Sequence, residues 1–308
     1  MNFTLPDDIL EMKRKARVFI DEECIPLEKD LEPDWIELQP DIHNRLVEKI
    51  KALGLWGVGV PQEFGGVGMG ALGYAAVREE QCRSHIGTSH YTPFGGEIPP
   101  PLFHSTDTQK ERYLFPLLQG EKKISFAQTE PGAGSDAAAI QTTAVQEQDG
   151  WRINGVKRFA TLADKADVLM VVAVTDPEKR ARGGITMFLV DRDTPGINIR
   201  RILEVLRPQH STEIDLNDVF VPHESVLGEV GQGFAMAQQF LVKGRISIAA
   251  RCLGIAQRAL EMAIEHAQKR QTFGQYLSER QAIQWMLADS YMELHAARLL
   301  TYETAWKE

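Results

Sequence analysis

One short segment, residues 125–136, carries the residue types best suited to hold a ligand. It reads SFAQTEPGAGSD: a short apolar run, then a Pro-Gly turn with small residues and hydroxyls. Exposed backbone N–H groups and hydroxyls in such a turn can bind a polar, anionic ligand, because no bulky side chain stands in the way. A plain hairpin corner is the alternative, and the spacing alone favours it.

A second glycine-rich segment, residues 68–73, fits the G-x-G-x-x-G pattern. The dinucleotide fingerprint requires a strand before this pattern and a helix after it, within a parallel βαβ unit. No second parallel strand is predicted within reach, so a flexible loop leading into a helix is the favoured interpretation. The sequence contains no P-loop, nucleophile-elbow or H-E-x-x-H motif.

Histidines and cysteines do not form a recognisable metal or disulfide pattern. The eight histidines, His104 and His210 among them, are scattered, and no two have a metal-ligand spacing on one helix face. Cys24, Cys82 and Cys252 are too far apart for a zinc site and too few for a disulfide framework. We therefore expect no metal, and reduced thiols in a reducing compartment.

The overall composition excludes several classes of protein. With 43% hydrophobic and 25% charged residues in a chain of 308, a folded protein of two or three domains is expected. A net charge of −9 disfavours nucleic-acid binding, which needs a basic face. No uncharged apolar run approaches the ~20 residues of a membrane span. No secretory signal is visible, and the acidic start favours the cytoplasm over the mitochondrial matrix.

The elements that would position these residues fall into three regions. Helical periodicity with loops dominates residues 1–122, with helices near 41–53, 71–83 and 107–118, the last bending or breaking around Pro116. Short β-branched runs bounded by turns follow, with candidate strands at 168–174, 185–190 and 197–202. Strands this short without intervening helices indicate an antiparallel sheet or barrel.

The third region is helical again. No proline follows Pro222, and two long helices, interrupted at Gly274, are expected to pack antiparallel. Two helices alone leave an apolar stripe with little to cover it. We therefore expect either further chain after Glu308 or a partner chain over this surface.

Four motifs, in order along the chain, resemble those of the acyl-CoA dehydrogenase family. Residues 125–136 resemble its T-E-P-x-A-G-S-D signature, and residues 151–157 its W-x-I-N-G-x-K hairpin. Residues 218–233 resemble its D-V-x-V-P…L-G…G-x-G segment, and residues 270–281 its R-x-x-F-G…Q segment. The similarity runs from about Phe19 to the last residue.

This resemblance implies an α+β multidomain fold. It has an N-terminal helical domain (1–122), a middle antiparallel β-barrel (123–228) and a C-terminal helical bundle (229–308) with only the first two long helices present. It also implies a homo-oligomer, a dimer or a tetramer built as a pair of dimers. FAD would lie noncovalently in the crevice between barrel and bundle, with the acyl-CoA thioester against the flavin.

Carried over position by position, the resemblance also names site residues. Thr129 would place its hydroxyl near the flavin's polar edge, and Ser135 would lie near both the pyrophosphate and the CoA arm. Phe159 stands where tryptophan is commoner in the family, and Leu162-Ala163 stands where Asn-Gly is usual. The residues implied to bind the cofactor within one subunit are Phe126, Gln128, Thr129, Ser135, Phe159 and Thr161.

A second set lies near the C-terminal end of the chain. Arg270, Phe273 and Gln281 match positions that reach the FAD of the neighbouring subunit, where a planar guanidinium suits a pyrophosphate. If so, dimerisation completes the cofactor site. Arg245 matches a helix arginine close to the bound acyl-CoA; an intrahelical ion pair is its alternative role.

The implied reaction is FAD-dependent α,β-dehydrogenation of an acyl-CoA thioester in fatty acid and lipid metabolism. A carboxylate removes the α-proton while the β-hydrogen leaves as hydride to flavin N5, with an electron-transfer flavoprotein as the electron acceptor. The family's usual base position lies beyond residue 308, and the minority position is Gly244 here. No catalytic residue is therefore named. An inactive acyl-CoA-binding or interaction protein, and a flavin oxidase or monooxygenase, remain as alternatives.

Overall fold

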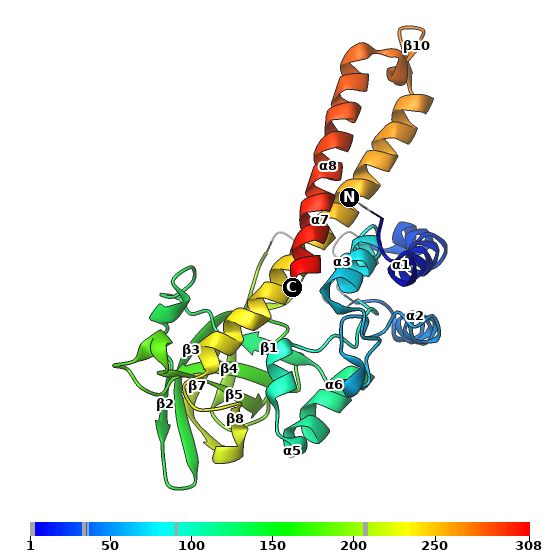
Figure 1. Ribbon diagram of the computed structural model, residues 1–308. Coiled ribbons are helices and arrows are strands. Elements are labelled where there is room, and N and C mark those ends of the chain that lie inside the picture. The colour runs from blue at the N-terminus through cyan, green and yellow to red at the C-terminus, as the bar shows by residue number, and fades with distance from the viewer. Residues whose placement is uncertain (1–3, 33–34, 36, 90–91, 206–208) are drawn as a thin grey trace. The chain divides into compact units, whose positions relative to one another are not determined.

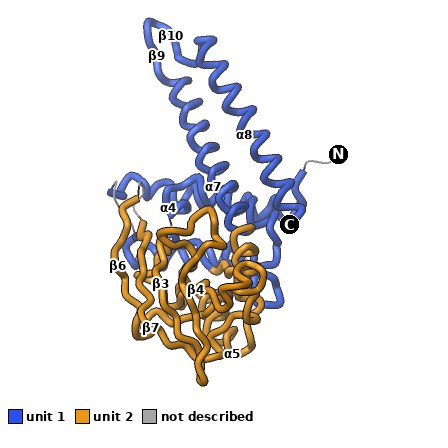
Figure 2. Tube along the Cα trace, turned by 90° about the vertical axis from the view of Figure 1, so that its left-hand side faces the viewer, with its two compact units in different colours: residues 1–33, 37–95, 243–308 blue, residues 34–36, 96–242 orange. Residues whose placement is uncertain are grey.

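The chain folds into two compact units (Figure 2). The computed structural model describes residues 4–32, 35, 37–89, 92–205 and 209–308. We call residues 1–33, 37–95 and 243–308 the helical unit, and residues 34–36 and 96–242 the sheet unit. The long helix α7, Gly233–Lys269, contributes residues to both units.

The N-terminal part of the helical unit follows the predicted apolar periodicity. Ile9, Met12, Ala16 and Phe19 form the buried stripe of α1. A π-helical turn, Ile20–Cys24, and a 3₁₀ turn, Ile25–Asp30, continue that helix. Gly70 opens α3, and residues 37–69 as described contain no strand before it, so the loop-to-helix interpretation of the glycine pattern is confirmed. The helices here are α1 Asp7–Phe19, α2 Pro40–Ala52, α3 Gly70–Gln81 and α4 His85–Thr88.

The C-terminal part of the helical unit is a helical hairpin (Figure 1). Helix α7 returns as α8, Gln281–Lys307, and Leu253, Leu260 and Leu294 form their shared apolar contact. Between them lie β9, Gln271–Thr272, and β10, Gln275–Tyr276, paired antiparallel, and a 3₁₀ turn, Leu277–Glu279. Within the described ranges, no helix is long and apolar enough to cross a membrane.

The sheet unit is built on eight strands. Their order is β6-β7-β3-β2-β4-β5-β8, with β1 paired to β4. Most pairs are antiparallel as predicted, but β1 lies parallel to β4, which sequence spacing did not indicate. The strands are β1 Ile124–Ala127, β2 Thr143–Gln146, β3 Gly150–Thr161, β4 Val168–Val174, β5 Ile185–Asp191, β6 Ile197–Leu203, β7 Ser211–Pro222 and β8 Val226–Leu227.

The core of the sheet unit explains which strands were easy to predict. All seven residues of β4 are buried, which is why β4 reads as a continuous apolar run. Other strands of the sheet contribute side chains to the same core, including Trp151 and Ile153 of β3 and Phe188 of β5. The predicted sequence of helices, sheet and helices is therefore confirmed.

The helix expected over residues 107–118 is irregular, and its irregularity lies before the proline. It consists of α5 Asp107–Gln109, a π-helical segment Lys110–Leu114, and α6 Phe115–Gln119. Pro116 lies in the first turn of α6, directly after the π-helical segment. These helices belong to the sheet unit.

Candidate functional site

The segment singled out from the sequence forms a tight loop at the end of β1. Phe126 lies in β1 opposite Met170 of β4, and its ring lies 4.6 Å from the ring of Phe240. Glu130 and Ala133 exchange backbone hydrogen bonds of 3.1 Å across the Pro-Gly tip. We call residues 128–142 the cofactor loop. Gln128 and Thr129 lie at its start and Ser135 lies exposed beyond the turn.

Strand β3 runs beside the start of this loop. The N–H of Arg158 donates to the carbonyl of Thr129 at 2.7 Å, and the Ser125 hydroxyl donates to the carbonyl of Thr161 at 2.7 Å. A bulge in the β3–β7 pairing gives Phe159 a φ of 58° and leaves it 52% exposed. The structure thus brings the segments of Thr129, Phe159 and Thr161 together in one unit.

The polar groups and the free space at this loop fit FAD, which is large, polar and aromatic. Gln128 is 5% exposed, and its Nε2 has no hydrogen-bond partner among the described residues. A buried amide without a partner costs free energy unless a ligand supplies one. A Cβ added at Gly132 or Gly134 would meet nothing within 4 Å in the described part of the chain. A ligand can therefore approach the backbone closely there.

A buried ion pair, to which sequence reasoning gave no role, lies beneath the cofactor loop. Lys157 of β3 is completely buried, and its Nζ lies 2.8 Å from Glu130 Oε1 and 3.1 Å from the carbonyl oxygen of Gln128. Burial lowers the pKa of Lys157 to about 8 although Glu130 acts to raise it. Burial also acts to raise the pKa of Glu130, but Lys157 and the donors at Thr142 and Gln141 hold it below its ordinary value.

A signal for this pair was present in the sequence. Trp151, Ile153 and Lys157 fall at inward positions of β3, where an apolar residue is expected. A lysine at such a position needs a buried acidic partner. Arg180 also supports the loop, because its Nη2 donates to the carbonyls of Ala138 at 3.0 Å and Ile140 at 2.9 Å.

The other predicted cofactor residues lie in the helical unit, around the α7–α8 connection. Arg270 follows α7, Gln281 opens α8, and both are exposed. Phe273 is 100% exposed with a φ of 52°. Arg280, which was not predicted, holds this connection by donating to the carbonyl and the hydroxyl of Thr272 at 2.5 and 2.9 Å. Arg245 is exposed on α7.

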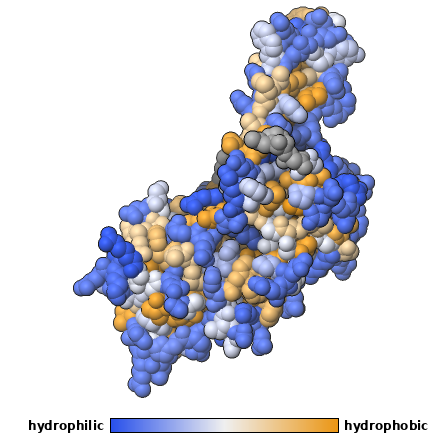
Figure 3. Space-filling model, in the orientation of Figure 1, coloured by the Kyte–Doolittle hydropathy of each residue, from blue (hydrophilic) through white to orange (hydrophobic). Residues whose placement is uncertain are grey.

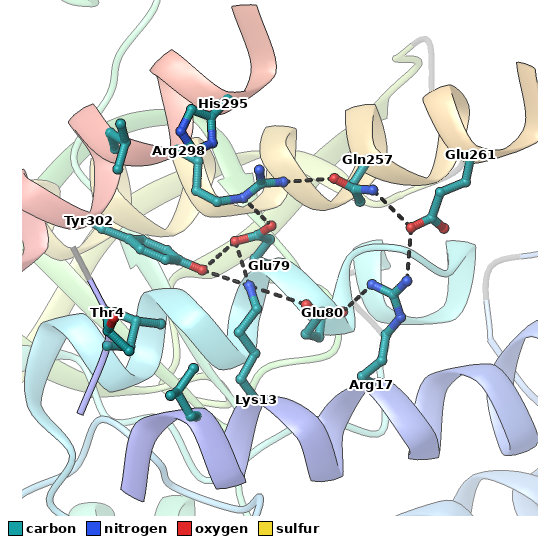
Figure 4. Close-up of a pocket in the computed structure, with 13 residues that line it drawn as sticks. Thr4, Lys13, Arg17, Glu79, Glu80, Gln257, Glu261, His295, Arg298 and Tyr302 are labelled. Carbon is teal, nitrogen blue, oxygen red and sulfur yellow. Dashed lines mark hydrogen bonds and ion pairs between the residues drawn. The ribbon is translucent and has the colours of Figure 1, made fainter. Parts of the chain in front are cut away.

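A cavity of about 600 Å³ in the helical unit is lined by a charged network (Figure 4). Glu79 of α3 accepts from Lys13 Nζ and from Arg298 Nε, each at 2.9 Å, and from the Tyr302 hydroxyl. Burial acts to raise the pKa of Glu79, but these three donors hold it below its usual range. The network also contains Arg17, Glu80, Gln257 and Glu261.

Charges in this network compensate one another. Arg17 bridges Glu80 at 3.2 Å and Glu261 at 2.8 Å, and Lys13 also lies 3.2 Å from Glu80. Burial raises the pKa of Tyr302, so its hydroxyl stays protonated and donates to Glu79. The network joins α1, α3, α7 and α8, which indicates a structural role rather than a charged ligand site.

Apolar side chains remain on the surface of the helical hairpin (Figure 3). A groove of about 890 Å³ lies between α7 and α8 and includes Leu253, Leu260 and Leu294 in its lining. Large apolar side chains are also exposed on this hairpin, and the apolar stripe in the sequence predicted only some of them. They include Ile248, Met262, Trp285, Met286, Tyr291, Met292, Leu300 and Trp306.

Comparisons with known proteins cover almost the whole chain. Residues 6–121 match the N-terminal domain of acyl-CoA dehydrogenase, residues 125–219 its middle domain and residues 231–308 its C-terminal domain. The chain is 38% identical to (R)-benzylsuccinyl-CoA dehydrogenase of Thauera aromatica, covering 100% of this chain and 79% of that protein. It is 37% identical to the human mitochondrial short-chain specific acyl-CoA dehydrogenase, covering 98% and 73%.

A third relative and two solved structures extend the comparison. The caffeyl-CoA reductase-Etf complex subunit CarC of Acetobacterium woodii is 37% identical, covering 88% of this chain and 73% of that protein. Butyryl-CoA dehydrogenase from Megasphaera elsdenii matches with a TM-score of 0.86 and 33% identity, over 100% of this chain and 81% of that one. The FAD complex of PigA matches with a TM-score of 0.88 and 28% identity, over 100% and 80%. Matches to all three domains, together with this shared fold, show that the chain belongs to the acyl-CoA dehydrogenase family.

Proposed function

We propose that this chain binds FAD and an acyl-CoA thioester and takes part in α,β-dehydrogenation of that thioester. The observation that carries the proposal is the cofactor loop, with its open glycines and the buried Gln128 amide that has no partner in the described part of the chain. The loop includes Thr129 and lies beside Phe159 and Thr161, and the family resemblance assigns all three to the flavin. Relatives named as acyl-CoA dehydrogenases, and the FAD complex of PigA, support the same cofactor and substrate class.

Each group in the sheet unit has a distinct binding task in this proposal. FAD, when bound, supplies the redox chemistry by accepting a hydride equivalent. The Gln128 amide and the hydroxyls of Thr129 and Thr161 donate hydrogen bonds to polar atoms of the cofactor ring. The Phe126 and Phe159 rings exclude water from its flat face. Ser135 and the backbone N–H groups near Gly134 bind phosphate oxygens.

Residues in the helical unit complete the proposed site. Arg270 binds pyrophosphate oxygens of the FAD held by a second copy of the chain, and Phe273 and Gln281 contact the same cofactor. Arg245 binds the acyl-CoA. Because Arg270, Phe273 and Gln281 serve the neighbouring copy, the proposal requires a homo-oligomer, a dimer or a tetramer. The fully exposed Phe273 supports this requirement, since an exposed aromatic side chain gains free energy when a partner covers it.

The base that removes the α-proton is placed outside residues 1–308. Gly244, which precedes Arg245, has no group that can accept a proton. A glutamate desolvated beside the substrate would have its pKa raised toward neutrality and could act as this base. Electrons would pass to an electron-transferring flavoprotein, a partner supported by the relative described as a subunit of an Etf complex.

Visible absorption of the purified protein tests the proposal. We expect a bound-flavin spectrum that is lost in Gln128→Leu, and retained in Gln148→Leu as an exposed control in the same unit. We expect acyl-CoAs of different chain length to perturb this spectrum without bleaching it anaerobically. Rapid bleaching would contradict our placement of the base, whereas failure to retain flavin would contradict the function itself. Hydrogen peroxide production would favour a flavin oxidase.

A further inference from the structure

The ion pair between Lys157 and Glu130 lies under the cofactor loop without facing solvent. The side chain of Lys157 is 0% exposed and that of Glu130 is 5% exposed. Burying two charges is unfavourable unless each is paired and hydrogen-bonded, and here both are. Two apolar side chains could fill the same volume at a lower free-energy cost, so the presence of two charges at this position needs an explanation.

Glu130 joins the two ends of the cofactor loop. Its Oε2 accepts the N–H of Gln141 at 2.5 Å, and its Oε1 accepts the N–H of Thr142 at 3.0 Å. The residues that close the loop are therefore held by one carboxylate near its start. Because a carboxylate accepts such bonds more strongly than a neutral group does, the charge of Glu130 strengthens this closure.

Lys157 fixes that carboxylate from the strand below. Its ammonium donates both to Glu130 and to the carbonyl of Gln128, so it also holds the backbone of the residue that carries the unpartnered amide. Neighbouring cations have other partners. Arg158 lies 3.5 Å from Glu213, and Arg180 bonds the carbonyls of Ala138 and Ile140.

We propose that Lys157 and Glu130 are positioning residues, which hold the cofactor loop in the conformation that binds FAD. Neither side chain needs to touch the cofactor, since both act through the backbone of residues 128, 141 and 142. This inference rests on the proposed function for its FAD readout. Its structural part concerns the chain alone and can be measured without cofactor.

Lys157→Met tests the role most directly. We expect the dissociation constant for FAD to rise about 10- to 100-fold, the effect that removal of outer-shell partners has in metal sites. In the FAD-free protein, hydrogen exchange should accelerate in the peptide covering residues 128–142 and stay unchanged in β4. The control is Arg152→Gln in the same strand, which removes ion pairs with Glu147 at 3.0 Å and Asp218 at 3.5 Å. It should leave both measurements within about twofold, as surface pairs contribute little.

A pH profile separates positioning from a general loss of stability. Without Lys157, burial would raise the pKa of Glu130, so lowering the pH should neutralise its carboxyl, weaken its hydrogen bonds to Gln141 and Thr142, and lower the FAD affinity of Lys157→Met further. Wild-type protein should show no such loss over the same pH range, because Lys157 helps to hold the pKa of Glu130 below its ordinary value. In free energy, the loss of FAD affinity in the double variant Glu130→Gln/Lys157→Met should be smaller than the sum of the losses in the two single variants, because the two partners act as one unit.

Glu130→Gln keeps the size of the side chain and serves if Lys157→Met does not fold. Unchanged loop exchange and unchanged FAD affinity in a folded Glu130→Gln protein would overturn the inference. Additive effects in the double variant would overturn it too. If wild type and Arg152→Gln alike retain no FAD, the proposed function fails instead, and the exchange data identify that case.

Discussion

Glu79→Gln should destabilise the helical unit, although the two side chains have nearly the same size. The Glu79 carboxylate is 2% exposed and faces Lys13 and Arg298, which are 21% and 20% exposed. Glutamine keeps the shape but removes the charge. Arg298 then loses its carboxylate partner and Lys13 keeps Glu80, 3.2 Å away, so two partly buried cations each lose their nearest negative charge, which is a costly way to break a buried pair.

The structure sets the size of this effect. Removing one partner of a fully buried ion pair costs about 3–5 kcal/mol. Since Lys13 and Arg298 are each partly open to water, their hydration offsets part of this cost. We therefore expect Glu79→Gln to lower the free energy of unfolding by about 2–3 kcal/mol. At about 2–4 °C per kcal/mol for a unit of this size, the melting temperature should fall by about 4–12 °C.

Calorimetry of the two variants at neutral pH provides the test. Glu303→Gln is the matched control, because Glu303 pairs with Lys307 one turn along α8 on an exposed surface. Its loss should cost less than about 0.5 kcal/mol. If Glu79→Gln lowers the melting temperature no more than Glu303→Gln does, then the network of Figure 4 does not stabilise the unit as argued.

Three further outcomes follow from charge and exposure. The pKa values of Glu79, Glu130 and Glu261 in the folded protein are lowered from 4.5. Their ionised carboxylates therefore stabilise the folded state fully above pH 4.5, and this stabilisation is lost as the pH falls through the lowered pKa values. A urea unfolding midpoint that stays constant from pH 6 to 3 would contradict this. Burial lowers the pKa of Lys157 to about 8, so FAD affinity should fall from pH 7 to 9 in wild type and not in Lys157→Met, as fluorescence titration can measure. Phe273→Ser should shift light-scattering mass toward a smaller species without lowering the melting temperature; an unchanged mass would argue against contact between copies at this connection.

Much of the fold could be predicted because strong local patterns coincide with burial. The continuous apolar run of β4 and the helical stripe of α1 are set by the core that each segment faces. The parallel pairing of β1 with β4 could not be predicted, because its partners lie far apart in sequence and no local pattern specifies them. The irregularity around Pro116 was predicted from the proline, but its form, a π-helical segment directly before the proline, was not.

The candidate site, like the fold, could be predicted only in part. The family resemblance supplied Gln128, Thr129 and Thr161, and the structure brings their segments together in the sheet unit. It did not supply roles for Glu130 and Lys157. Their importance depends on hydrogen bonds that reach across 27 residues of chain, from β3 to the loop. Such long-range polar contacts leave only a weak trace in sequence, a charge where the strand pattern calls for an apolar residue.

Gly155 gives the first bulge of β3 a consequence for protein engineering. A methyl group added there would lie 2.3 Å from the Thr142 hydroxyl oxygen and 2.7 Å from its Cα. It would therefore push against Thr142, the residue that ends the cofactor loop. Directed-evolution libraries that leave position 155 unchanged would therefore preserve the anchorage of the loop. Libraries that randomise this position would weaken the anchorage without changing any side chain that we propose to contact the cofactor.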